Sequence, residues 1–211
     1  MDIRRISSGN RVKRSDDPFV RYALAIQYNG GRYLGFSRQR DVHPNVRRRP
    51  LPPSVESRIA CALDSLTGDE GHRGLEISSR TDRGVHALWN VAHVDVRPRP
   101  SMSGAAWDPR KLQGGINHWL KRDTYGKRIN TACGDDVRVV SVARAPSCDW
   151  SARYHAIGRT YIYRILACPE SSMFGIPFEF DRAWIFPGKL DIDAMNEAAK
   201  TLVGTHDFSS F

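Results

Sequence analysis

Four segments of the chain have the hydrophobic pattern of β-strands. In 20–28, apolar residues alternate with smaller or polar ones, and an Asn-Gly-Gly turn signal follows. The run 91–96 alternates in the same way and places Ala92, Val94 and Val96 on one face. The four predicted strands are 20–28, 75–79, 91–96 and 137–143.

Two segments between these strands repeat apolar residues at helical spacing instead. The first runs from Val55 to Leu66, with Pro53 near its start and Gly68 at its end. The second is predicted over 109–121. The resulting order, βαββαβ, is that of RRM-like and ferredoxin-like domains. We therefore expect an α+β fold whose RRM-like domain spans 20–146, after a basic tail over 1–19.

The remaining residues, 147–211, predict the start of a second mixed α/β unit. A strand is expected over 159–167 and a helix over 191–203, with Asp191 as N-cap and Gly204 as the residue after the C-cap. Two elements without a complete sheet would leave an unpaired strand edge, which proteins avoid. The sequence is therefore expected to be a fragment or a truncated gene model.

The charge of the chain is unevenly distributed. The 211 residues carry a net charge of +9, with 40% hydrophobic and 26% charged side chains, which is a globular composition. Residues 1–50 hold twelve basic and four acidic side chains, so eight of the nine net charges lie there. This excess suggests a polyanionic partner, whereas a solvated basic tail is the alternative and suits residues 1–18. The candidate RNA-binding surface consists of Arg38, Arg40, Arg47, Arg48 and Arg49.

The sequence also limits the compartment and the kind of site. No apolar run approaches the length of a transmembrane helix, so a membrane-spanning protein is not expected. The four cysteines form no C-x-x-C pair, which disfavours a zinc or redox motif and suits a reducing compartment. Residues 1–15 are rich in Arg and Ser like a mitochondrial transit peptide, although Asp2 opposes this. A mitochondrial or a cytoplasmic location remains open.

The segment 78–87, with the sequence SSRTDRGVHA, is the candidate for chemistry. A strand leads Asp82 into a turn beside Gly84, between Arg80 and Arg83. Nearby cations favour the ionised carboxylate, which suits a nucleophile or a proton-abstracting base. The alternative is an ordinary Asp turn with solvated arginines, because Asp and Gly are common turn residues.

This segment resembles the R-T-D-x-G-V-H-A motif of the TruA family of tRNA pseudouridine synthases. Further blocks, before and after this segment, match the family in the same order along the chain. The variant at Ser78-Ser79-Arg80 looks closest to the eukaryotic branch called pseudouridylate synthase-like one. The other matching blocks are Tyr28-Asn29-Gly30-Gly31 with Gly35-Phe36 and Gln39, Val55-Glu56 with Ala62-Leu63, Asn117, Ala152-Arg153 with Arg159-Thr160-Tyr161-Ile162-Tyr163, and His206-Asp207-Phe208-Ser209-Ser210-Phe211.

The resemblance implies a homodimeric enzyme that isomerises uridine in tRNA without a cofactor or metal. Asp82 would be the essential carboxylate, either attacking C1′ or removing the C2′ proton of a flipped nucleotide. Tyr161 would stack on the flipped base, or else be a core aromatic. Arg80 would hold a phosphate or prop the vacated space, or else pair with Asp82. His86 is expected to order the turn rather than bind metal.

Departures from the family leave a second reading open. Arg83 stands where the family has a small residue, and a later family helix, whose Arg is thought to pair with the catalytic Asp, is absent from the sequence. The alternative is therefore a non-catalytic RNA-binding protein that has lost activity through truncation. A carboxylate-based hydrolase is disfavoured because no second acid is placed as its partner.

Overall fold

The computed structural model describes residues 18–38, 53–98, 104–122, 136–169, 179 and 181–210. The chain forms two compact units, one ending at Ile157 and the other running from Gly158 to Phe211.

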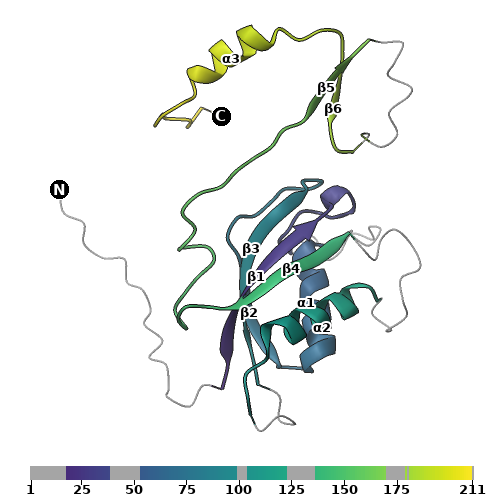
Figure 1. Ribbon diagram of the computed structural model, residues 1–211, viewed down its shortest axis with the longest axis vertical. Helices are drawn as coiled ribbons and strands as arrows, with labels where there is room; N and C mark the ends of the chain where they lie inside the picture. The colour runs from purple at the N-terminus through teal and green to yellow at the C-terminus, as the bar shows by residue number, and fades with distance from the viewer. Residues whose placement is uncertain are drawn as a thin grey trace, which may run out of the picture. The chain divides into compact units, whose positions relative to one another are not determined.

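The first unit is a four-stranded antiparallel sheet with two helices on one face (Figure 1). The strand order is β2-β3-β1-β4, and every neighbouring pair is antiparallel. The predicted order βαββαβ and the α+β class are confirmed, although β2 and β3 begin three and four residues earlier than predicted. The elements are β1 (Val20–Tyr28), α1 (Val55–Thr67), β2 (His72–Ile77), β3 (Ala87–Val96), α2 (Pro109–Leu120) and β4 (Val137–Arg144).

The core lies between the helices and one face of this sheet. The side chains of Ala92, Val94 and Val96, which the sequence placed on one face, are fully buried. They are joined from α1 by Ile59 and from α2 by Ile116. The apolar side chains at alternate positions of the strands therefore pack against those at helical spacing in α1 and α2. Together they form one apolar layer, whose burial stabilises the unit.

Local capping fixes where each helix of the first unit begins. The Ser54 hydroxyl accepts a hydrogen bond from the Ser57 amide (3.0 Å), and the Ser57 hydroxyl accepts one from the Ser54 amide (3.1 Å). This reciprocal capping box satisfies two amides that the helix leaves without partners. At α2, Asp108 caps the first turn and Pro109 occupies the first helical position, where its missing amide costs nothing.

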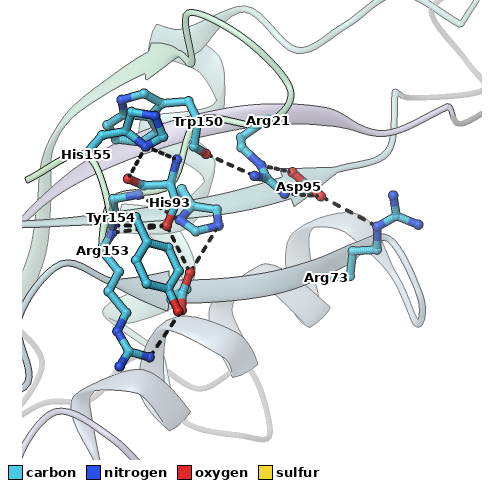
Figure 2. Close-up of polar contacts among 11 residues, drawn as sticks. Arg21, Arg73, His93, Asp95, Trp150, Arg153, Tyr154 and His155 are labelled. Atoms are coloured by element: carbon cyan, nitrogen blue, oxygen red, sulfur yellow. Dashed lines mark hydrogen bonds and ion pairs between the residues drawn. The ribbon is translucent and has the colours of Figure 1, made fainter. Parts of the chain in front are cut away.

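Residues 150–155 cover part of the other face of the sheet (Figure 2). Arg21 of β1 pairs with Asp95 of β3 (2.6 Å) and donates to the Trp150 carbonyl (2.9 Å). The Ala152 amide donates to Nδ1 of His93 (3.1 Å). The segment that follows β4 is thus tied to the sheet by polar side chains that alternate with the core residues.

Further contacts hold the same segment to β2. The Ser151 hydroxyl donates to a Glu76 carboxylate oxygen (3.2 Å), and Arg153 lies 3.9 Å from the same carboxylate. Ser151 and Ala152 are buried as a result. Residues 150–155 therefore pack as part of the first unit.

The second unit contains a parallel pair, β5 (Ile165–Cys168) and β6 (Trp184–Pro187), and the helix α3 (Ile192–Lys200). The strand predicted over 159–167 was wrong for most of its length. Residues 158–164 have no regular secondary structure, because strand pairing with β6 begins only at Ile165 opposite Trp184. An alternating sequence forms a strand only where a neighbour supplies hydrogen bonds.

Helix α3 begins as predicted and ends three residues early. The Asp191 carboxylate caps it by accepting from the Ala194 amide (2.9 Å). After Lys200 the amides of Thr201, Leu202 and Val203 each bond to the carbonyl three residues before, so the chain tightens out of the α-helix. Gly204, with φ of +117°, therefore lies beyond the position that follows the C-cap.

Candidate active site

The segment with the Asp82 motif forms the connection between β2 and β3. The Ser78 amide bonds to the Val91 carbonyl (2.7 Å), so strand-like pairing continues one residue past β2. The chain then turns, with the Val85 amide bonded to the Asp82 carbonyl (3.2 Å) and Gly84 at φ of +81°. Asp82 lies on this turn, as the sequence indicated, and its side chain is exposed. We call residues 78–86 the Asp82 turn.

The end of β1 and the loop after it hold the Asp82 turn from one side. The Tyr28 hydroxyl lies 2.8 Å from the Thr81 hydroxyl, and the Phe36 amide donates to the Thr81 carbonyl (3.0 Å). The Gly30 amide donates to Nδ1 of His86 (3.1 Å), so this histidine orders the turn. The residue directly before Asp82 is thus held through both its side chain and its main chain.

Two glycines allow the backbones to approach this closely. A Cβ atom on Gly35, whose φ is +104°, would lie 2.6 Å from the Thr81 carbonyl oxygen. A Cβ atom on Gly30 would lie 1.9 Å from the Val85 carbonyl oxygen. Any larger residue at either position would push the loop away from the Asp82 turn.

The loop after β1 is itself fixed to the start of β4. The Asn29 amide donates to the Asp136 carbonyl (2.8 Å), and the Tyr33 hydroxyl donates to the Asp136 carboxylate (3.1 Å). Burial raises the pKa of both the Asp136 carboxyl and the Tyr33 phenol. This contact anchors the loop on the side away from the turn.

Asn90 supports the Asp82 turn from β3. Its amide nitrogen donates to the Ser79 carbonyl (2.9 Å) and to the Tyr28 hydroxyl (3.2 Å). Its amide oxygen accepts from the Ser78 hydroxyl (3.0 Å). Sequence reasoning missed Asn90 and treated Tyr28 only as a strand residue and a family match. An asparagine on the apolar face of an alternating strand was the available signal, since buried polar groups need partners.

The Asp82 carboxylate is exposed in the first unit. Among the residues that the structure describes, none forms a hydrogen bond or an ion pair with it. Arg80 and Arg83 are exposed as well, and neither pairs with Asp82 within the same described set. The alternative in which Arg80 neutralises Asp82 is therefore not observed.

The other predicted site residues lie apart from this turn in sequence. Tyr161 belongs to the second unit, where its side chain is 77% exposed. Arg38 is exposed, with its amide bonded to the Glu56 carboxylate (3.0 Å). Four arginines of the candidate RNA-binding surface lie outside the described residues: Arg40, Arg47, Arg48 and Arg49.

Within the described residues, no group of three His, Cys, Asp or Glu side chains is placed to hold a metal ion. In the same part of the chain, no helix has both the length and the apolar character needed to cross a membrane.

Comparison with known proteins gives a consistent set of relatives. No family model matches the chain. A protein named tRNA pseudouridine synthase A from Sinorhizobium medicae (strain WSM419) is 37% identical over 192 residues, which cover 90% of this chain and 64% of the relative. The protein of the same name from Rhizobium meliloti (strain 1021) is 38% identical with the same coverage. That from Dinoroseobacter shibae is 34% identical over 193 residues, 90% of this chain and 60% of the relative. The chain thus spans less than two thirds of these relatives.

Proposed function

We propose that the chain belongs to the TruA family of tRNA pseudouridine synthases, as the names of its relatives suggest, and that it isomerises uridine to pseudouridine in tRNA. The observation that carries the proposal is the Asp82 turn, which holds an exposed carboxylate on a backbone fixed from β1 and β3. The finer fold assignment, an RRM-like first domain, is supported by the strand order β2-β3-β1-β4 with both helices on one face.

The reaction places one demand on Asp82. The C1′–N1 bond of the target uridine breaks, the uracil turns over and its C5 bonds to C1′, after which C5 loses its proton and N1 gains one. The product has the same atoms as the substrate, so the proposal needs no cofactor. Asp82 either attacks C1′ and is later released, as in retaining glycosidases, or removes the C2′ proton and returns it. Both routes require a free, ionised carboxylate beside the ribose.

The remaining site residues receive roles as RNA contacts. The target uridine must leave the base stack, and an exposed ring such as that of Tyr161 offers a face for it. Exposed Arg80 is suited to a phosphate next to the flipped nucleotide. The surface of Arg38, Arg40, Arg47, Arg48 and Arg49 would add salt-dependent backbone contacts.

The assembly and location of the protein are part of the same proposal. We expect a homodimer that binds tRNA. The Arg-rich and Ser-rich residues 1–15 are compatible with import into mitochondria, and a cytoplasmic location is the alternative.

Replacing the carboxylate tests the proposal. In the full-length protein, Asp82→Asn keeps the size of the side chain but can neither attack C1′ nor accept a proton. We expect pseudouridine formation to fall by about 10³-fold or more, while the tRNA dissociation constant stays close to that of the wild type. Pseudouridine mapping in tRNA and a filter-binding titration measure the two quantities.

Asp69→Asn is the matched control, because Asp69 is also exposed and lies in a turn of the first unit. It should keep full activity. Unchanged modification by Asp82→Asn would disprove the role of Asp82. A wild-type protein that binds tRNA but forms no pseudouridine would instead support the non-catalytic RNA-binding alternative.

A further inference from the structure

Three side chains from separate segments meet directly behind the Asp82 turn. Tyr28 ends β1, Asn90 lies on β3, and Thr81 is the residue before Asp82. Tyr28 is 3% exposed and Asn90 is 8% exposed, so both are shielded from water. The Asn90 amide nitrogen lies 3.2 Å from the Tyr28 hydroxyl, which lies 2.8 Å from the Thr81 hydroxyl.

The partners of Asn90 fix the direction of its hydrogen bond to Tyr28. Its amide oxygen accepts from the Val91 amide (3.0 Å), which can only donate, and its amide nitrogen donates to the Ser79 carbonyl (2.9 Å), which can only accept. The second amide hydrogen of Asn90 is therefore directed to the Tyr28 oxygen. The Tyr28 oxygen thus accepts a hydrogen bond from Asn90, while either hydroxyl can donate in the hydrogen bond between Tyr28 and Thr81.

This chain of bonds ends next to the proposed catalytic group. The Thr81 carbonyl is already held by the Phe36 amide (3.0 Å), so the Tyr28 contact fixes the side chain of a residue whose main chain is fixed as well. Placement errors of about 1 Å can reduce catalysis by about 10²-fold. Because Thr81 is held through both its side chain and its main chain, it can fix the position of the neighbouring Asp82 carboxylate relative to the ribose.

We propose that Tyr28, oriented by Asn90, is a positioning residue that places Asp82 through the Thr81 hydroxyl. The inference rests on the proposed function, since it assigns Tyr28 a role in the reaction of Asp82. It requires that removing the phenol oxygen lowers kcat more than it raises KM, because the RNA contacts remain.

The experiment compares isosteric changes in the full-length protein. We expect Tyr28→Phe and Thr81→Val each to lower kcat by about 10-fold to 100-fold, with KM changed by less than about threefold. Because both changes break the same bond, the double variant should be little worse than either single one. Thr81→Ser keeps the hydroxyl and should restore most of the lost kcat.

Tyr22→Phe is the matched control for a general loss of stability. Tyr22 lies on the same face of β1, is fully buried and donates to the Trp107 carbonyl (2.8 Å), away from the Asp82 turn. Its loss should lower the melting temperature about as much as that of the Tyr28 hydroxyl but leave kcat unchanged. Equal losses of kcat in Tyr22→Phe and Tyr28→Phe, or wild-type kcat in Tyr28→Phe or Thr81→Val, would overturn the proposal.

Amide hydrogen exchange tests the positioning role of Tyr28 without measuring enzyme activity. The Val85 amide bonds to the Asp82 carbonyl and the Phe36 amide to the Thr81 carbonyl, so both report on the turn. In Tyr28→Phe, and not in Tyr22→Phe, we expect their exchange to quicken by about fivefold to tenfold, as the loss of one buried hydrogen bond implies. Unchanged exchange would contradict the positioning role, even if the wild type makes no pseudouridine and the proposed function itself fails.

Discussion

Gly35 is one of two points where the loop after β1 comes close to the Asp82 turn. Its φ of +104° is unfavourable for other residues, and a Cβ atom there would lie 2.6 Å from the Thr81 carbonyl oxygen. The same loop donates the Phe36 amide to that carbonyl. A single methyl group at Gly35 would therefore both strain the backbone and displace the loop that donates to the Thr81 carbonyl.

We expect Gly35→Ala to lower the free energy of unfolding by about 1–3 kcal/mol and to reduce pseudouridine formation as well. Gly68→Ala is the control, because Gly68 also has a positive φ of +81° but nothing lies within 4 Å of its Cβ position. Urea unfolding and tRNA modification assays of both variants would distinguish strain from displacement. Full activity in Gly35→Ala would show that the close approach does not position Asp82.

The location of Asp82 could be predicted from the sequence, whereas its support could not. The motif alone indicated a turn after a strand, because Asp and Gly are local turn signals. The meeting of Tyr28, Thr81 and Asn90 depends on the pairing of β1 with β3, which shifts register between Ile26 and Tyr28. A register shift leaves no local pattern in the sequence.

Among the helices, those that bury an apolar face matched their predictions best. Helix α1 combines helical apolar spacing with a capping box, and its observed bounds, Val55–Thr67, lie close to the predicted run. Helix α3 buries no residue, and its end was misplaced by three residues. The strand expected over 159–167 reached only Ile165–Cys168 because its extent depends on β6, a partner far along the chain.

The capping box of α1 gives a prediction at the scale of the element. Ser54→Ala removes the oxygen that accepts from the Ser57 amide, and we expect it to lower the free energy of unfolding by about 0.5–2 kcal/mol. Ser65→Ala is the matched control, since Ser65 is exposed in the same helix and its hydroxyl donates to the Cys61 carbonyl within that helix. It should change stability by less than about 0.5 kcal/mol. Equal effects of the two changes would contradict the assigned cap.

In the molecule as a whole, the positive charge and the structured polar contacts lie in different parts of the chain. Residues 1–50 hold most of the net positive charge. The Asp82 turn and the buried polar contacts of Figure 2 depend on pairing between strands instead. Among these contacts, His93 is buried against Trp150 and accepts from the Ala152 amide, and its other ring nitrogen lies 3.8 Å from the Glu76 carboxylate.

His93 makes the stability of the first unit depend on pH. Burial, and then the charge of Arg21, lower its pKa, while Glu76 and Asp95 oppose the shift. The unfolded chain takes up a proton near the ordinary pKa of about 6.5, but the folded chain does so only at lower pH. The contribution that the neutral His93 makes to the free energy of unfolding is therefore fully present above that pH and is lost as the pH falls below it.

We expect urea unfolding to show a lower free energy at pH 5.5 than at pH 7.5, and His93→Gln to reduce this difference. His72, whose pKa burial also lowers, would account for part of the remaining dependence. The exposed His118→Gln is the control and should keep the wild-type difference. An unaltered pH dependence in His93→Gln would contradict the assignment to His93.

The anchors of the Asp82 turn also have a consequence for the order of events during translation. The hydrogen bonds that hold the turn join residues between Tyr28 and Val91, so no later part of the chain supplies them. Domains generally fold as units during synthesis, and an N-terminal domain folds before a later one. The support of the carboxylate can therefore assemble while the second unit is still being synthesised, and nascent chains halted after β4 should already contain it.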